Sequence, residues 1–128
     1  MKATLPLALL TLFGAAGCHV ALPVAGAVVV SEEFQDNAVS TTVPEKTKVV
    51  WPSVLSSLSG MTDALIHRDD EHHAAHTRID SGVVTVHVWQ PDTGETQIRV
   101  AAKKFLVYNH ELSQMVMDRI VNELRAAK

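Results

Sequence analysis

Four histidines and three carboxylates are concentrated in ten residues, positions 67–76. Imidazole nitrogens and carboxylate oxygens bind borderline divalent metals such as zinc, nickel and copper. If this segment were helical, His72 and His76 would lie one turn apart on one face. The spacing matches neither the His-Glu-x-x-His motif nor its inverted form, so it predicts no catalytic zinc site. The candidate metal ligands are His67, His72, His73 and His76.

The same segment has the composition of a polar loop between two strands, and we favour this interpretation. Strand alternation then directs His76 to solvent, on the side opposite to Ala75 and Thr77. A loop holds three or four ligands in one geometry poorly, so its histidines should bind metal weakly and without preference. We therefore expect no resident cofactor, and a zinc dissociation constant on the order of 10⁻⁶ M or weaker.

A second candidate site is an interaction patch made of His87, Trp89 and Arg99. His87 and Trp89 flank Val88 in a predicted strand, so they share its outer face, with Gln97 and Arg99 as cross-strand neighbours. An exposed aromatic ring beside a cation is a common recognition surface. Alternatively, Trp89 caps the edge of the sheet or packs beneath a loop.

The sequence offers little support for an enzyme. The serines at positions 53, 56, 57 and 59 are predicted to lie on the solvated face of a helix and not at a nucleophile elbow. Without Lys2, ten basic side chains accompany fourteen acidic ones, so no attraction to nucleic acid is expected. The single cysteine, Cys18, excludes an intramolecular disulfide.

The N-terminus has the features of a secretory leader. Lys2 is followed by an apolar run, residues 5–13, that is too short to span a bilayer. The segment 14–18, Gly-Ala-Ala-Gly-Cys, resembles a lipobox, the cleavage signal of bacterial lipoproteins, in which the cysteine thiol receives a diacylglyceryl group. With its amine also acylated, Cys18 exceeds the two signals needed for stable anchoring.

Two other interpretations of the leader stay open. An ordinary signal peptidase could cleave after an Ala-x-Ala-like site, or the leader could remain as a membrane-spanning anchor, because apolar residues resume from Val20 to Val30. Pro6, Pro23 and three glycines make residues 5–30 a poor spanning helix, so we favour the lipoprotein. His19 stands where aspartate signals retention in the inner membrane, which favours an outer-membrane lipoprotein facing the periplasm.

The rest of the chain predicts a small α+β domain over residues 37–128, preceded by the signal peptide (1–17) and by the lipidated cysteine with its membrane-proximal tether (18–36). Strands are predicted at 38–43, 63–68, 75–79, 83–89 and 95–102, with a Pro-Asp-Thr-Gly turn at 91–94. Residues 84, 86, 88, 98 and 100 should face the core. The order strand-helix-strands-helix predicts an antiparallel sheet of four to five strands with two helices on one face.

The two helices are predicted from apolar spacing and capping residues. The first has an apolar face at positions 51, 54, 55, 58 and 61, with Thr47 as N-cap and Gly60 as C-terminal stop. Pro52 either begins this helix or kinks its first turn. The second is capped by Asn109 and carries the apolar stripe Leu112, Met115, Val116, Ile120 and Leu124.

Together, leader and layout resemble the small bacterial lipoproteins called domain of unknown function 3568. The resemblance lies in Gly17-Cys18 with the apolar tether, in Val50-Trp51 opening a helix that ends at Gly60-Met61, and in Glu111-Leu112-Ser113 running into Met117-Asp118-Arg119-Ile120. Asn109-His110 departs from the Gly-Asp expected before the last helix. The resemblance implies an anchored α+β domain and carries over no catalytic residue.

We therefore expect a lipid-anchored envelope protein that acts as a non-enzymatic binding or structural module. Its partners would be the membrane, through the lipid on Cys18, and another envelope protein. The alternative is a metal-binding envelope protein that uses the histidine-rich segment 67–76.

Overall fold

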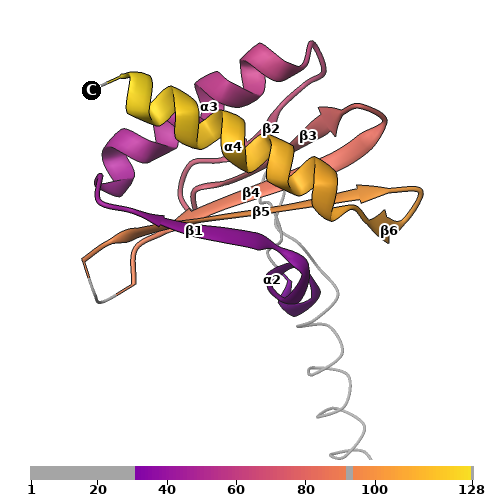
Figure 1. Ribbon diagram of the computed structural model, residues 1–128, viewed down its shortest axis with the longest axis horizontal. Helices are drawn as coiled ribbons and strands as arrows, with labels where there is room; N and C mark the ends of the chain where they lie inside the picture. The colour runs from indigo at the N-terminus through magenta and orange to yellow at the C-terminus, as the bar shows by residue number, and fades with distance from the viewer. Residues whose placement is uncertain (1–30, 92–93, 128) are drawn as a thin grey trace, which may run out of the picture.

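The computed structural model of the chain describes residues 31–91 and 94–127. The predicted signal peptide, Cys18 and most of the predicted tether lie outside the described residues. No helix in the described part has the length and apolar character needed to cross a membrane. In chain order the elements are α2 (Glu32–Asn37), β1 (Val39–Val43), α3 (Thr47–Met61), β2 (His67–Asp69), β3 (Ala74–Ile79), β4 (Gly82–Trp89), β5 (Thr96–Lys104), β6 (Val107–Tyr108) and α4 (His110–Ala126), as Figure 1 shows.

The six described strands form one antiparallel sheet in the order β1-β5-β4-β3-β2, and β6 pairs with the far end of β5. The predicted α+β class is confirmed. The sheet has one more strand than the upper prediction, because the short β6 doubles back from β5. A short additional helix, α2, precedes the sheet.

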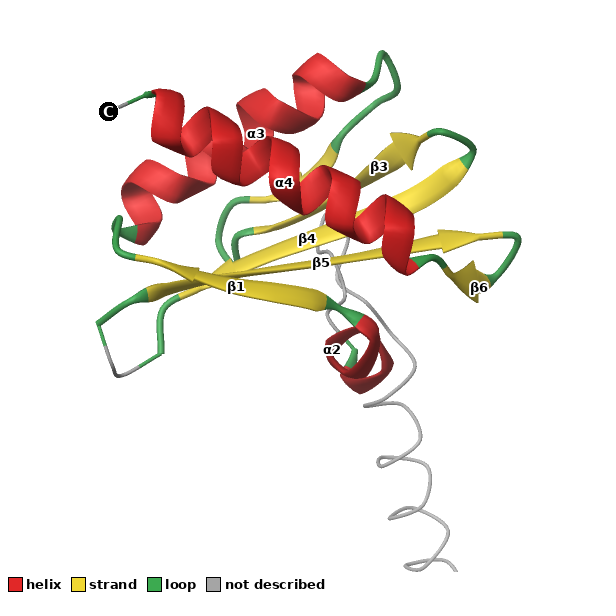
Figure 2. Cartoon of the chain, in the orientation of Figure 1, coloured by secondary structure: helices red, strands yellow, loops and turns green. Residues whose placement is uncertain are grey.

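One face of the sheet is covered by α3 and α4, which lie across it (Figure 2). Alternate side chains of β4 and β5 point to these helices and are at most 1% exposed, which confirms the predicted core face. These residues are Val84, Val86, Val88, Ile98 and Val100. The opposite face of the sheet, called the outer face below, carries the residues that alternate with them.

The start predicted for α4 is confirmed, whereas the start and the stop predicted for α3 are wrong. In α4, the Asn109 side chain accepts a hydrogen bond from the Leu112 amide at 2.8 Å, as expected of an N-cap. In α3, however, Lys46 occupies the N-cap without a side-chain bond, Thr47 is already helical, and Gly60 lies inside the helix. Thr62 is extended there, and its hydroxyl donates to the Arg78 carbonyl at 2.6 Å, which fixes the end of α3.

The predicted stripe on α4 is wrong at one position. Met115 is 44% exposed, whereas Met117 is 2% exposed and belongs to the core. Positions 113, 117, 120 and 124 follow the three- and four-residue spacing of a helix face. This face was missed in the sequence because its first residue, Ser113, is polar.

The last part of the predicted tether is folded and not a linker. Ser31 caps α2 by accepting a hydrogen bond from the Phe34 amide at 3.1 Å, and Phe34 is only 5% exposed. Glu33 forms an ion pair with Lys103 of β5 at 3.4 Å. The folded domain therefore begins before residue 37, because Phe34 provides an apolar anchor beside the sheet.

The predicted strand at 63–68 is reduced to the three residues of β2. Residues 63–66 instead run along the free edge of β3 and contact it through side chains. Thr77 donates its hydroxyl to the Leu65 carbonyl at 2.9 Å, in addition to the Thr62 bond to Arg78. Polar side chains thus occupy part of an edge that would otherwise present unpaired backbone groups.

Two hairpins of the sheet turn through two residues with positive φ. Asp80 (φ 50°) and Ser81 (φ 65°) connect β3 to β4, and Phe105 (φ 53°) and Leu106 (φ 67°) connect β5 to β6. Positive φ at both central residues is the requirement of a type I′ turn. The predicted turn at 91–94 has Gly94 at φ 87° with its amide bonded to the Pro91 carbonyl, while residues 92 and 93 lie outside the described part.

Candidate functional site

The predicted interaction patch lies on the outer face, where β4 and β5 pair. Register places Trp89 opposite Gln97 and His87 opposite Arg99, so the cross-strand neighbours are those predicted. The indole Nε1 of Trp89 donates to Gln97 Oε1 at 2.7 Å. The guanidinium carbon of Arg99 stands 4.8 Å from the centroid of the Trp89 ring, within cation–π range. The patch is therefore a preorganised arrangement of a ring, a cation and an amide.

His87 is a partly buried member of this patch. Burial lowers the pKa of His87, and the nearby charges of Arg99, His73 and His72 lower it further. Its Nδ1 is buried and has no hydrogen-bond partner among the described residues. The ring is thus held largely neutral at physiological pH, and it acts as a polar surface group and not as a cation.

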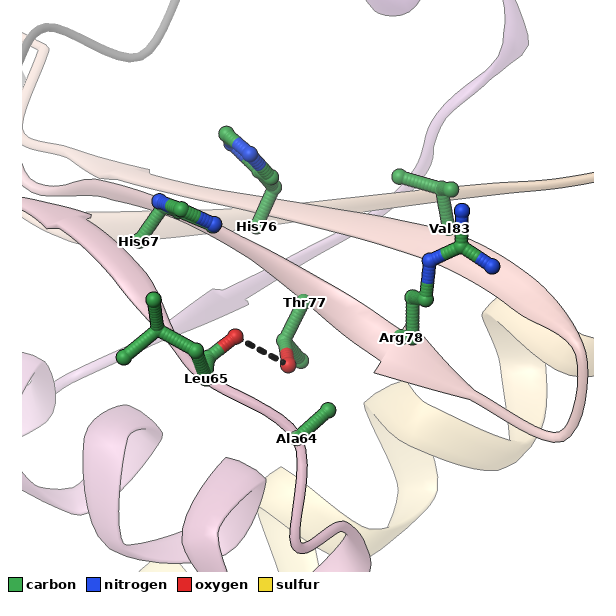
Figure 3. Close-up of a pocket in the computed structure, with 7 residues that line it drawn as sticks. All are labelled: Ala64, Leu65, His67, His76, Thr77, Arg78 and Val83. Atoms are coloured by element: carbon green, nitrogen blue, oxygen red, sulfur yellow. Dashed lines mark hydrogen bonds between the residues drawn. The ribbon is translucent and has the colours of Figure 1, made fainter.

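His67 and His76 form a second group on the outer face, in the adjacent strands β2 and β3. They are paired in register, and their rings stack with centroids 4.7 Å apart and planes 21° apart. Burial and the neighbouring His67 lower the pKa of His76. The pair lies at one side of an open pocket of about 340 Å³ that Leu65, Arg78 and others also line (Figure 3).

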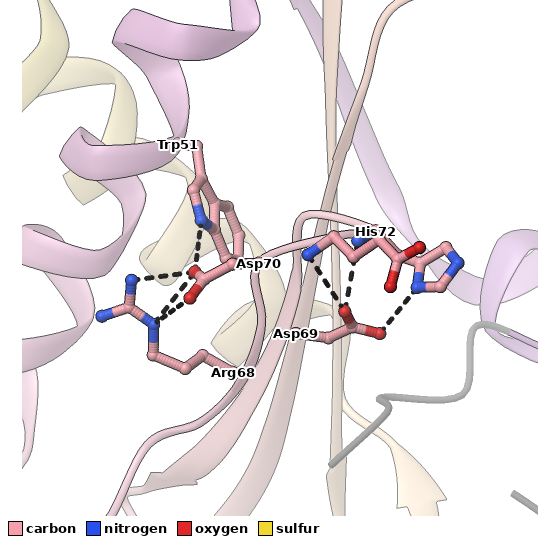
Figure 4. Close-up of polar contacts among 6 residues, drawn as sticks. Trp51, Arg68, Asp69, Asp70 and His72 are labelled. Carbon is pink, nitrogen blue, oxygen red and sulfur yellow. Dashed lines mark hydrogen bonds and ion pairs between the residues drawn. The ribbon is translucent and has the colours of Figure 1, made fainter. Parts of the chain in front are cut away.

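His72 lies in the turn that connects β2 to β3 and contacts Asp69 there. The Asp69 carboxylate accepts hydrogen bonds from the amides of Glu71 and His72, both at 3.2 Å, and its other oxygen lies 2.8 Å from His72 Nδ1 (Figure 4). This hydrogen bond with Asp69 is the main cause of a raised pKa of His72. Asp69 and His72 therefore act as a turn-closing pair.

His73 belongs to a different environment, beside the first turns of α3. It has a positive φ of 52°, and its ring lies 5.4 Å from that of Trp51. The Trp51 indole donates to Asp70 Oδ1 at 2.9 Å, and Arg68 forms an ion pair with the same oxygen at 2.8 Å. Hydrogen bonds from Arg68 and then Trp51 lower the pKa of Asp70 (Figure 4).

Sequence reasoning missed this Trp51–Asp70–Arg68 contact, because Trp51 was assigned only to the apolar face of its helix. The detectable signal was the indole N–H, which needs a partner when the ring is buried. Here Trp51 is 6% exposed. Ser57 was also misplaced on a solvated face: it is fully buried, and its hydroxyl donates to Glu123 Oε2 of α4 at 2.7 Å.

The four predicted metal ligands are thus divided among three environments. His67 and His76 are together, His72 is paired with Asp69, and His73 packs on Trp51. In residues 31–91 and 94–127, no group of three or more His, Cys, Asp or Glu side chains is arranged to hold a metal ion. The stacked pair supplies two imidazoles, which is fewer than the three or four protein ligands of a zinc site.

Comparison of the chain with models of known families and with curated proteins gives no match to either. The arrangement on the outer face must therefore be interpreted from its own chemistry. It offers aromatic, cationic and imidazole groups at a solvated surface, which suits recognition of another molecule.

Proposed function

We propose that the chain is a bacterial envelope lipoprotein, anchored through lipid on Cys18, whose folded domain is a non-enzymatic binding or structural module. The observation that carries the proposal is the order of the leader: a basic start, a short apolar run, and small residues directly before the only cysteine. His19 after that cysteine supports an outer-membrane location facing the periplasm. Membership of the family called domain of unknown function 3568 is part of this proposal.

The patch formed by Trp89, Arg99 and His87 is the proposed contact with another envelope protein. Its ring and guanidinium are held in place by a hydrogen bond and a cation–π contact, so little side-chain entropy remains to be lost on binding. Aromatic and arginine side chains are also the residues most enriched in binding hot spots.

The anchor is tested by changing Cys18. In the producing bacterium, Cys18→Ser should abolish incorporation of labelled palmitate and leave the precursor uncleaved, because the thiol is the acceptor of the diacylglyceryl group. The matched control, His19→Asp, should keep the label and, in an enteric-type host, move the protein to the inner membrane. Labelling that persists in Cys18→Ser would contradict the anchor.

A metal-binding role is the second candidate, and the stacked pair of His67 and His76 is the observation that favours it. We expect a zinc dissociation constant on the order of 10⁻⁶ M or weaker, with affinity fading in acid because protonated imidazole cannot bind metal. Calorimetry on the full chain tests this expectation. One tight stoichiometric site that is lost in both His67→Ala and His76→Ala, and also in His72→Ala if the turn contributes a ligand, would make metal binding the principal function.

A further inference from the structure

The β5–β6 hairpin ends in three consecutive apolar residues that the fold leaves in water. Phe105 is 89% exposed, Leu106 is 92% exposed and Val107 is 68% exposed. Single exposed apolar residues are common on protein surfaces, but three adjacent ones at a projecting turn form a patch. The segment Phe105–Leu106–Val107 is called the apolar tip below.

The backbone conformation of the apolar tip is one that large apolar residues rarely adopt. Phe105 and Leu106 both have positive φ, at 53° and 67°, in a two-residue turn where asparagine, aspartate and glycine are preferred. Large side chains are disfavoured in this left-handed region. A strained conformation that buries nothing within its own domain indicates a role outside the domain.

The flanking residues suit a lipid–water boundary. Lys103 Nζ lies 4.6 Å from the centroid of the Tyr108 ring, so an amphipathic ring and a cation stand directly beneath the apolar residues. Lys104 also adjoins the turn, on the opposite face of the hairpin, where it lines a hollow with Asn109 at the start of α4. Glu33 pairs with Lys103, and Asp80 and Glu111 line a hollow with Lys104, so the local charge is mixed.

The apolar tip also lies near the place where the chain enters the folded domain. Ser31 and Phe34, at the start of α2, line one hollow with Lys103 and Tyr108, and Figure 2 shows α2 and β6 below the same end of the sheet. Ser31 lies thirteen positions after Cys18, a separation that the chain can span over at most roughly 45 Å. An anchor on Cys18 would therefore keep this end of the domain within reach of the bilayer.

We propose that the apolar tip inserts into the lipid bilayer to which the chain is anchored, with Lys103, Lys104 and Tyr108 at the headgroup level. The proposal rests on the anchor of the proposed function for its orientation. A bilayer is favoured over a protein partner because three side chains cannot supply the roughly 800 Å² per partner of a specific protein interface. Insertion into lipid requires no complementary surface. Because the surrounding charge is mixed, insertion should depend little on lipid charge.

A single fluorescent label tests the insertion. The chain has one cysteine, and lipidation blocks its thiol, so Val107→Cys in the lipidated full chain provides one reactive site. The labelled protein is reconstituted into vesicles of phosphatidylethanolamine and phosphatidylglycerol, and into phosphatidylcholine vesicles. An environment-sensitive dye at position 107 should shift to the blue and be quenched by spin-labelled acyl chains in both. The control is Val49→Cys on α3, a 50% exposed valine, which should report water.

A second pair of changes separates insertion from mere proximity. Phe105→Asn with Leu106→Gly in the labelled chain introduces residues that favour the turn and removes two apolar side chains. Transfer of each such side chain from water to lipid changes a partition equilibrium by roughly tenfold or more, so the equilibrium constant for insertion should fall by roughly a hundredfold and quenching should decrease. Unchanged quenching in this variant would overturn the proposal.

The remaining outcomes are also decisive. A dye at position 107 that reports water in both vesicle types, in a chain whose lipid is confirmed by mass, overturns insertion and leaves the anchor intact. Protection of the dye only after addition of envelope proteins contradicts the bilayer and assigns the apolar tip to a protein. Labelling of the chain without Val107→Cys shows a free Cys18 thiol, which contradicts the anchor; the insertion test is then repeated with Cys18→Ser.

Discussion

The two-residue turns of the sheet share a backbone shape and differ in chemistry. Asp80 (φ 50°) and Ser81 (φ 65°) have short polar side chains of the kind that turns favour, and aspartate in particular tolerates positive φ. Phe105 and Leu106 adopt the same φ region without either advantage. The first turn is explained by folding alone, whereas the second costs stability and leaves apolar surface in water. The difference indicates that residues 105 and 106 serve a purpose other than closing a hairpin.

The largest expected effect concerns the core that both hairpins share. Val86, in β4, is fully buried between Ala75 and Val100, so Val86→Asp should lower the free energy of unfolding by roughly 3–5 kcal/mol. Val83→Asp is the matched control, because Val83 lies in the same strand and is 42% exposed; it should cost less than about 1 kcal/mol. Thermal melts of the two variants and the parent decide, and a Val86→Asp domain that melts like the parent would show that the sheet has been assigned the wrong face.

The residues that follow the two turns should also differ. A Cβ on Gly82 would lie 2.6 Å from Leu112 Cδ2 and 3.1 Å from the Lys103 carbonyl oxygen, so Gly82→Ala should destabilise the domain by about 1–3 kcal/mol. The corresponding residue of the second hairpin, Val107, is 68% exposed, and Val107→Ala should change stability by no more than about 0.5 kcal/mol. Urea denaturation measures both. A destabilised Val107→Ala would mean that the apolar tip packs within the domain.

Substitution of the turn residues should affect the two hairpins differently. Phe105→Asn with Leu106→Gly should stabilise the domain by about 1–2 kcal/mol, because these residues adopt positive φ more readily. Asp80→Asn with Ser81→Gly should gain less, since the native residues already suit the turn. A loss of stability in Phe105→Asn with Leu106→Gly, measured by chemical denaturation, would show that the native turn is not strained.

The smallest effect is a pH dependence. The pKa values of His76 and His87 are lowered in the folded state, so the unfolded chain binds more protons as pH falls below about 6.5, and stability should decrease there. The raised pKa of His72 acts in the opposite sense, adding stability below that pH that is lost as pH rises through its folded pKa. Exposure of that side chain to solvent keeps its contribution small.

Melting temperatures at pH 7.5 and 5.5 test this dependence. His87→Gln should reduce the difference between the two melting temperatures. The control is Phe105→Asn with Leu106→Gly, which introduces no titratable group and should change the melting temperature equally at both pH values. A domain that is more stable at pH 5.5 would show that His72 outweighs the two partly buried histidines.

Much of the fold could be predicted because local patterns and packing agree in it. Alternation in β4 and β5 identified the buried valines, and Asn109 marked the start of α4 correctly. Phe34 was missed because one aromatic residue in an acidic segment gives no periodic signal, although it is buried beside the sheet. The apolar run at 105–107 was missed because nothing in the sequence placed it at a turn. Its exposure depends on the return strand β6, which is only two residues long.

The candidate site was predictable only in part. Strand alternation and hairpin register give the Trp89–Gln97 and His87–Arg99 pairs, so the patch could be named from sequence. The separation of the histidines could not, since it depends on where β2 begins and on the positive φ of His73. A shift of β2 by one residue would exchange the faces of His67 and Arg68.

We propose above all that Cys18 carries the lipid that attaches this domain to the envelope. Intact-mass spectrometry of the protein extracted from membranes of the producing bacterium measures this modification. We expect a chain that begins at Cys18 and is heavier than its amino-acid sequence by a diacylglyceryl group, with or without a further acyl chain. A chain that begins at another residue, or a Cys18 without lipid, would show that the anchor is wrong.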